Sequence, residues 1–171
     1  MNLYPKLYCK KITDVKIDFL RKNNIKGIIL DIDNTLMDYD LNIIEGLEDW
    51  KNEMKNNDIK LMVVSNTNKK EKVKKVCNIL ECEHIIFAMK PLKRGFVKAQ
   101  KILGLNPENI AVVGDQISTD ILGANRCKMF SILVEPIDEK DIWITKIKRP
   151  IEKIVIDRYL KTKEVKKDVH K

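Results

Sequence analysis

The sequence predicts an α/β domain of three layers, in which helices cover both faces of a doubly wound, mainly parallel sheet of five strands. Five short apolar runs recur along the chain, and each is continuous and rich in branched residues. Runs of this kind are typical of strands that are buried on both faces. Between the runs, apolar residues recur at helical spacing. Strands that alternate with helices form right-handed βαβ units, which build a Rossmann-like sheet.

The predicted elements follow in a regular order along the chain. The five strands are expected at 28–30, 61–64, 85–87, 110–113 and 132–134. Helices are predicted between the strands by four apolar stripes: Leu47, Trp50 and Met54; Val73, Val76, Cys77 and Leu80; Phe96, Ala99 and Leu103; Ile117, Ile121 and Ala124. Two outer stripes bracket the sheet: Ile12, Val15, Phe19 and Leu20 before it, and Ile151, Ile154, Val155 and Tyr159 after it. Pro150 suits the first position of the last helix.

Length and composition favour one folded domain. The chain has 171 residues and a mass of 19.9 kDa, and domains commonly hold about 150 residues. Apolar residues make up 44% of the chain, which is enough to fill a core. We expect a single domain at 1–160 and a flexible basic tail at 161–171. No apolar run approaches the roughly 18 residues of a membrane-spanning helix, and residues 1–11 lack a signal-peptide core, so a cytoplasmic location is expected.

The net charge of the chain is compatible with a polyanionic partner but does not identify which kind of polyanion binds. Lysine and arginine total 33 against 25 acidic residues, which gives a net charge of +8. Such a charge attracts nucleic acid or anionic lipid. However, 28 of the 33 cations are lysine, whereas nucleic-acid binding usually brings arginine and interleaved aromatic residues. The composition therefore disfavours nucleic acid as the partner.

Polar residues follow four of the predicted strands, at the edge where doubly wound sheets bind their ligands. The sequence reads DIDNTL at 31–36, SNT at 65–67, KP at 90–91 and GDQISTD at 114–120. Together these segments bring carboxylates, a hydroxyl and an ammonium group to one edge. This set of groups is typical of a phosphoryl-transfer site.

The carboxylates of this set predict a magnesium site. Asp31, Asp33 and Asp115 are expected within a few ångströms of one another, where they would repel unless a cation lay between them. Hard oxygen ligands without imidazole or thiolate favour Mg²⁺, which shares its shell with a phosphate oxygen. Lys90 and Ser65 would supply a positive charge and a hydrogen-bond donor to the phosphoryl oxygens.

The same residues predict the roles of the two leading aspartates. Asp31 is expected to attack phosphorus and form an aspartyl-phosphate, which water then hydrolyses. Asp33 is expected to protonate the leaving alkoxide and later to take a proton from water. Taken alone, each of these residues could have a purely structural role, as part of a turn, as a helix cap or as a lysine exposed to solvent. Their occurrence in order, each at the end of its own strand, favours catalysis.

The four segments resemble the motifs of the haloacid dehalogenase (HAD) superfamily of phosphatases over about 27–134. Within it, GDQISTDILGAN at 114–125, LYP at 3–5 and RPIE at 149–152 are similar to the YqeG-like group, which is related to mitochondrial phosphatidylglycerophosphatases. The resemblance implies catalysis by Asp31, Asp33, Ser65 and Lys90, with supporting roles for Asp120, Asn66 and Thr35. It also implies Mg²⁺ held by the side chains of Asp31 and Asp115 and by the backbone carbonyl of Asp33.

The spacing of the motifs leaves no room for a cap domain. Only 25 residues lie between Asp33 and Ile59, and 22 between Thr67 and Lys90, and predicted elements already occupy both stretches. An uncapped site suits a phosphate displayed on something large, such as a lipid head group or a macromolecule. A partner subunit that serves as a lid is the alternative. The oligomeric state stays open.

The sequence is compatible with three classes of function. The first is a phosphatase, acting on phosphatidylglycerophosphate or on a soluble metabolite or a macromolecule. The second is a phosphate-binding module without turnover, and the third is a basic accessory protein of RNA or ribosomes. The segment Ile142, Trp143 and Ile144, flanked by lysines, would suit a lipid interface as well as a packed core, and peripheral contact with an anionic membrane is therefore one of the expectations.

Overall fold

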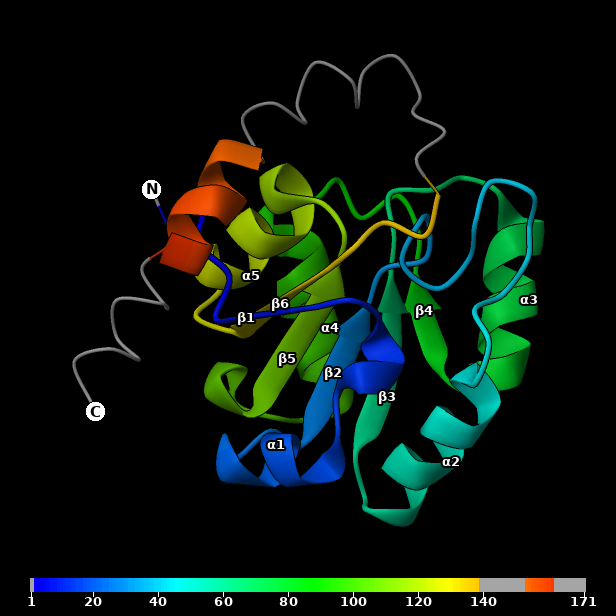
Figure 1. Cartoon of the computed structure of the whole chain (residues 1–171). Coiled ribbons are helices and arrows are strands. Elements are labelled where there is room, and N and C mark those ends of the chain that lie inside the picture. Colours follow the sequence, from blue (N-terminus) through cyan, green and yellow to red (C-terminus); the bar gives the residue numbers. More distant parts are fainter. Residues whose placement is uncertain (1, 139–152, 162–171) are drawn as a thin grey trace.

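The computed structural model describes residues 2–138 and 153–161 and contains one parallel sheet of six strands (Figure 1). The strand order is β1-β6-β5-β2-β3-β4, and every neighbouring pair is parallel. The strands are β1 (Leu7–Cys9), β2 (Gly27–Leu30), β3 (Lys60–Val64), β4 (Glu83–Ile85), β5 (Ile110–Gly114) and β6 (Phe130–Val134).

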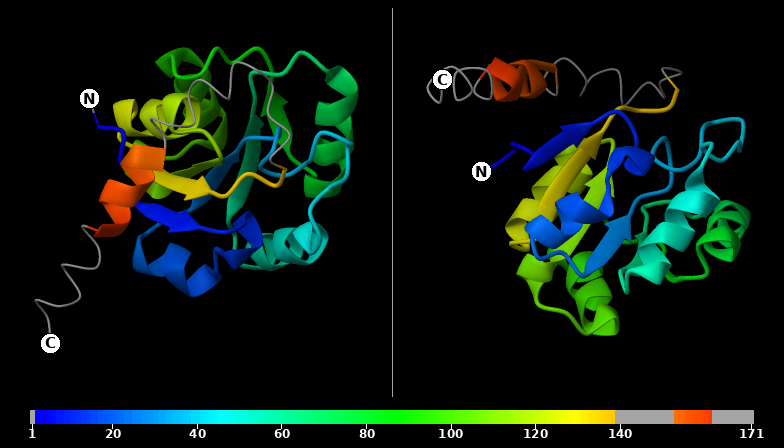
Figure 2. Two further views of the ribbon diagram at one scale, coloured as in Figure 1. Left: turned by 45° about the horizontal axis from the view of Figure 1, so that its top comes forward. Right: turned by 60° about the horizontal axis from the view of Figure 1, so that its bottom comes forward.

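Helices lie on both faces of this sheet, as the sequence predicts (Figures 1 and 2). They are α1 (Ile17–Lys22), α2 (Leu47–Asn56), α3 (Lys70–Leu80), α4 (Lys93–Leu103) and α5 (Leu122–Arg126). Short helical turns occupy Ile12–Asp14, Pro107–Asn109 and Ile117–Ile121, and a further helix lies at 153–161. The described part of the chain contains no helix that is both long and apolar enough to cross a membrane.

Alternate residues of the central strand face two different apolar cores. Ile28 and Leu30 of β2 pack with residues of α1, α2 and α3 on one face. Ile29, between them, packs with Phe96 and Ala99 of α4 and with Ala124 of α5 on the other face. This alternation follows from the two-residue period of a strand and confirms the three-layer architecture.

The sheet differs from the prediction at both edges. Its sixth strand, β1, was missed because it has only three residues and is half-buried, so the sequence shows no continuous apolar run there. The strand expected at 85–87 ends at Ile85, since Phe87 takes a positive φ of 50° and is 60% exposed. A strand cannot continue through that backbone conformation.

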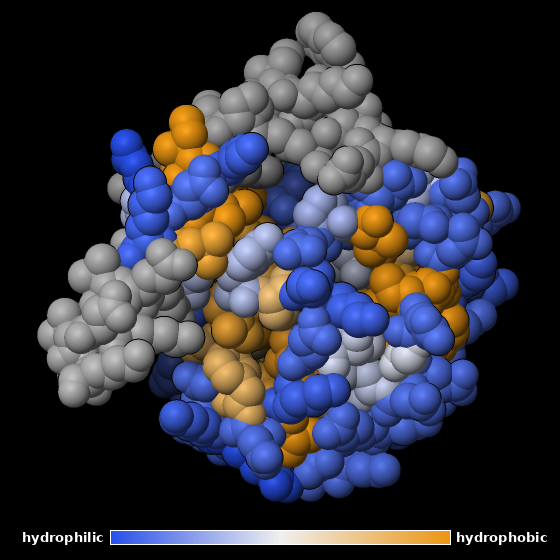
Figure 3. All heavy atoms as spheres, in the orientation of Figure 1, coloured by the Kyte–Doolittle hydropathy of each residue, from blue (hydrophilic) through white to orange (hydrophobic). Residues whose placement is uncertain are grey.

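The segments between the strands contain no inserted cap domain. The loop at 31–46 leads from β2 to α2, and only α3 and β4 separate Ser65 from Lys90. The face in Figure 3 is largely hydrophilic, with small apolar patches. The Trp143 segment, Pro150 and the tail from 162 onward lie outside the described residues.

Candidate active site

Four strand ends bring the predicted site residues to one edge of the sheet. Asp31 follows β2, Ser65 follows β3, Lys90 lies in the loop after β4, and Asp115 follows β5. Since β2 lies between β5 and β3, Asp31 stands between Asp115 and Ser65. The topology therefore explains why residues far apart in the sequence meet here.

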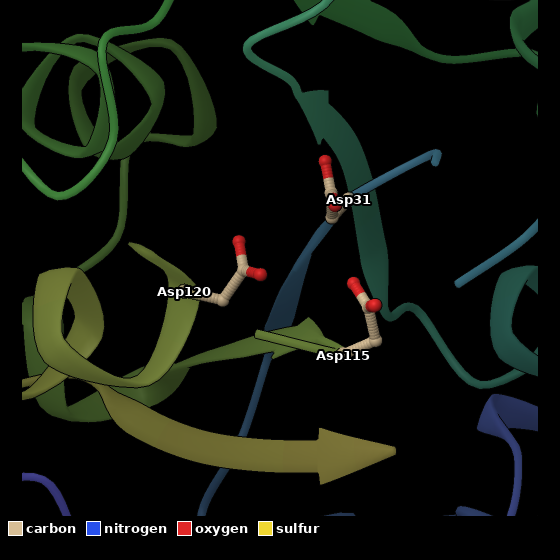
Figure 4. A group of neighbouring side chains, drawn as sticks. All are labelled: Asp31, Asp115 and Asp120. Carbon is tan, nitrogen blue, oxygen red and sulfur yellow. The ribbon is translucent and has the colours of Figure 1, made fainter. Parts of the chain in front are cut away.

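Three buried aspartates form the centre of the site (Figure 4). One carboxylate oxygen each of Asp31, Asp115 and Asp120 lies within 4.8 Å of the other two. Asp120 takes the place in this cluster that the strand-end argument gave to the Asp33 side chain. It reaches the cluster because the turn at Ile117–Ile121 is a π-helix, a geometry frequent at functional sites.

The backbone at Gly114 makes room for Asp120. A Cβ atom on Gly114 would lie 2.3 Å from Cγ of Asp120, so no larger residue fits. The backbone N–H of Gln116 and the hydroxyl of Thr119 donate to Oδ2 of Asp120, at 3.3 and 3.2 Å. These contacts hold its other oxygen, Oδ1, toward Lys90.

Lys90 is the only described cation that pairs with this cluster. Its Nζ lies 2.7 Å from Oδ1 of Asp31 and 2.6 Å from Oδ1 of Asp120, and its side chain is 3% exposed. The hydroxyl of Thr35 also donates to Asp115, at 3.4 Å. Three carboxylates thus face one ammonium group in a site that is largely closed to water.

Burial and this excess of negative charge shift the pKa values of the buried groups. Burial, together with the charge of Asp120, raises the pKa of Asp31 to about 6 although Lys90 acts against it. Burial and the charges of Asp31 and Asp120 raise the pKa of Asp115 well above its ordinary value. Burial alone would lower the pKa of Lys90, but Asp120 and Asp31 outweigh it and raise that pKa.

The residues of the cluster fit a divalent cation. All their donor atoms are carboxylate oxygens, which are the ligands that hard cations prefer. A cation would also offset the charge that Lys90 leaves unbalanced. Asp31, Asp115 and Asp120 are the described residues whose carboxylates together could hold it.

Asn66 holds the backbone of Lys90 in place. Its Oδ1 accepts from the Lys90 N–H at 2.7 Å, and its Nδ2 donates to the Lys90 carbonyl at 3.2 Å. The Lys90–Pro91 peptide bond is cis. Nearby, the buried Ser65 accepts from the Thr67 N–H at 3.2 Å, which fixes its hydroxyl at the end of β3.

Asp33 lies apart from the acidic cluster. Its side chain is 37% exposed, and its Oδ1 accepts from Nζ of Lys72 at 2.6 Å. Lys72 was not among the predicted site residues, although its position in the sequence carries a signal. Lys72 precedes Val76 by four residues and Leu80 by eight, so helical spacing places it on the buried face of α3.

Asn34 ties the loop after β2 to the segment after β6, and this contact was not predicted from the sequence. Its Nδ2 donates to the Asp138 carbonyl at 2.9 Å, and its Oδ1 accepts from the Asp138 N–H at 2.8 Å. Its φ of 62° is one that asparagine tolerates better than most residues. Asn34 therefore fixes the turn that follows Asp33.

The chain is similar to known phosphatases. A family model described as "Mitochondrial PGP phosphatase" matches residues 1–138. The chain is 37% identical to the "Probable phosphatase YqeG" of Bacillus subtilis (strain 168) over 153 residues, which cover 89% of this chain and 88% of that protein. It is also 34% identical over 79 residues to a "Glyceraldehyde 3-phosphate phosphatase" of Methanopyrus kandleri, covering 42% of this chain and 34% of that protein.

Solved structures share the fold at low sequence identity. A predicted HAD-like family hydrolase from Porphyromonas gingivalis has a TM-score of 0.55 and 14% identity, with 74% of this chain and 98% of that chain covered. An uncharacterised protein from Listeria monocytogenes serotype 4b has a TM-score of 0.55 and 19% identity, with coverages of 69% and 85%. The chain thus has the fold of a HAD-like hydrolase, belongs to the family of the mitochondrial PGP phosphatases and is a phosphatase of the YqeG-like group.

Proposed function

We propose that the protein is a Mg²⁺-dependent phosphomonoester hydrolase that works through an aspartyl-phosphate on Asp31. The observation that carries this proposal is the burial of Asp31 beside Lys90, at the strand end where Asp115 and Asp120 also meet. Mg²⁺, held by the side chains of Asp31 and Asp115 and by the Asp33 carbonyl, would supply positive charge to a phosphate oxygen. Asp120, Asn66 and Thr35 support these residues through the contacts described above.

The chain's own residues provide two successive displacements in this proposal. The Asp31 carboxylate attacks phosphorus, the ester P–O bond breaks, and Asp33 gives its proton to the leaving alkoxide. Water then attacks the phosphorus of the aspartyl-phosphate, Asp33 takes a proton from that water, and phosphate leaves with Asp31 restored. Lys90 and Ser65 stabilise the charge on the phosphoryl oxygens in both steps. The distance of Asp33 from the acidic cluster supports its role in proton transfer.

We further propose that the substrate is phosphatidylglycerophosphate, met at the inner face of the membrane by a cytoplasmic enzyme. The family description supports this substrate, and so does the lack of a cap in the described chain. Phe87, Met89 and Leu92, in the loop that carries Lys90, are exposed, and the chain carries a net charge of +8. Apolar side chains beside a basic surface suit an anionic lipid interface.

A phosphate-release panel tests both parts of the proposal. With Mg²⁺, we expect the highest kcat/KM on phosphatidylglycerophosphate in mixed micelles, and a lower kcat/KM on soluble sugar and nucleotide monophosphates. A preference for a soluble ester would overturn the lipid substrate and leave the chemistry standing. No release from any ester, including an aryl phosphate, would contradict the phosphatase mechanism and favour a silent or RNA-binding accessory protein.

Mg²⁺ is expected to stabilise the fold more at pH 7 than at pH 5. The folded pKa of Asp31, about 6, exceeds its ordinary value of 3.8. Protonation of Asp31 therefore stabilises the metal-free fold at low pH, and this contribution is lost as the pH rises through about 6. For Asp31 alone the loss between pH 5 and 7 is about 1 kcal/mol, and Asp115 shifts in the same direction.

Thermal unfolding with EDTA or Mg²⁺ at the two pH values measures this difference. Asp115→Asn is the matched variant, since it removes one proposed ligand and one buried charge, and its Mg²⁺ shift should be much smaller. An equal Mg²⁺ shift at pH 5 and pH 7, or an undiminished shift in Asp115→Asn, would argue against a cation held by these carboxylates.

A further inference from the structure

A cavity of about 700 Å³ opens beside Asp33, between the loop after β2 and the start of α3. In Figures 1 and 2 this loop runs alongside α3. A volume of this size is typical of small-ligand sites. Nine residues line it: Met37, Tyr39, Leu41, Asn68, Lys69, Lys70, Glu71, Lys72 and Lys75. We call this cavity the lysine pocket.

Two lining residues join the lysine pocket to the site of proton transfer. Lys72 donates to Oδ1 of Asp33 at 2.6 Å, and Met37 forms an isolated backbone bridge with Asp33. A further lining residue, Asn68, lies three residues after Ser65 on the loop that leaves β3. The pocket therefore begins where the alcohol of a bound phosphomonoester would leave.

Positive charge prevails in this pocket. Lys69, Lys70, Lys72 and Lys75 line it, and Glu71 is the one acidic side chain among its lining residues. Lys75 donates to the Leu41 carbonyl at 2.8 Å, which holds the loop against α3. Asp33 neutralises the charge of Lys72. The exposed Lys69, Lys70 and Lys75 then carry three positive charges against the one negative charge of Glu71.

We propose that the lysine pocket binds the alcohol part of the substrate and selects alcohols that carry a second negative charge. This inference rests on the proposed function, because it assumes that Asp33 protonates the leaving alcohol. Lysines around a partly closed cavity attract an anion through Coulomb forces, and a neutral alcohol gains nothing from them. The second anion can be a carboxylate or a phosphodiester, since the ammonium groups recognise charge rather than shape.

Kinetics on three soluble monoesters test the proposal. Glycerol monophosphate has a neutral alcohol, phosphoglycerate adds a carboxylate, and glycerophosphoglycerol phosphate adds a phosphodiester. We expect a higher kcat/KM for one or both anionic esters than for glycerol monophosphate, and the better of the two identifies the second anion. In Lys69→Gln/Lys75→Gln the ratio of anionic to neutral kcat/KM should fall about three- to tenfold, the range for two exposed charge contacts.

The matched control removes two lysines elsewhere on the surface. Lys74 is next to Lys75 but lines a different cavity, and Lys98 is exposed on α4. Lys74→Gln/Lys98→Gln changes the net charge equally and should keep the ratio. Because Lys75 also holds the loop, Lys69→Glu provides a second variant. An acidic residue is favourable at the start of a helix, so Lys69→Glu should fold. Its ratio of anionic to neutral kcat/KM should fall further than that of the single variant Lys69→Gln.

Salt adds an independent measurement. Raising the ionic strength from 20 to 300 mM should lower the anionic-to-neutral ratio of the wild type, because exposed charges are screened. The proposal is overturned if the wild type has no anionic preference, or if both double variants shift the ratio alike. Failure of the proposed function gives a different result, since no ester would then release phosphate.

Discussion

Asp31→Asn is expected to lower phosphate release at least about 1000-fold while the protein stays folded. The amide has the shape of the carboxylate but cannot form the aspartyl-phosphate, and loss of a covalent nucleophile removes the whole route. The fold should tolerate the change, because burial already raises the pKa of Asp31 to about 6 and thus disfavours its charge. Steady-state phosphate release together with thermal unfolding measures both effects.

Asp49→Asn is the control for this substitution. Asp49 lies exposed in the first turn of α2, so the same chemical change there should leave kcat and KM as in the wild type. Asp33→Asn should retain the attack on phosphorus for esters with good leaving groups, because an activated leaving group needs little protonation. An Asp31→Asn protein that keeps a tenth of the wild-type rate would exclude Asp31 as the nucleophile.

The positions of the central strands could be predicted because strands buried on both faces appear in the sequence as continuous apolar runs. Only strands with such runs can be located in this way, and the ends of β2, β3 and β5 then locate Asp31, Ser65 and Asp115. The half-buried β1 has no such run and was missed.

The partners of the site residues could not be predicted in the same way. The direction of a side chain depends on local backbone geometry that spacing does not reveal. Asp120 reaches the cluster from the π-helical turn, and Asp33, which lies beyond the end of β2, pairs with Lys72. A signal for Lys72 existed in the helical spacing of α3, but a lysine on an apolar face is easily read as solvated in a chain with so many lysines.

Lys90→Met is expected to destabilise the protein by about 3–5 kcal/mol at neutral pH and also to abolish phosphate release. Removal of one partner from a buried ion pair leaves the others uncompensated, and here Asp31 and Asp120 both lose their ammonium group. Methionine fills a similar volume, so the loss is mainly electrostatic. Denaturant unfolding in EDTA measures the change in the free energy of unfolding.

The pH dependence distinguishes this electrostatic loss from a packing defect. The pKa values of Asp31 and Asp115 are already raised in the wild type, and removal of Lys90 raises that of Asp31 further. Asp31, with a pKa of about 6, is largely protonated at pH 5, so the destabilisation by Lys90→Met should be smaller there than at pH 7. Lys98→Met, on the exposed face of α4, should change stability little at either pH. If Lys90→Met cost the same free energy at both pH values, packing rather than the charge of the buried lysine would be what stabilises this edge of the sheet.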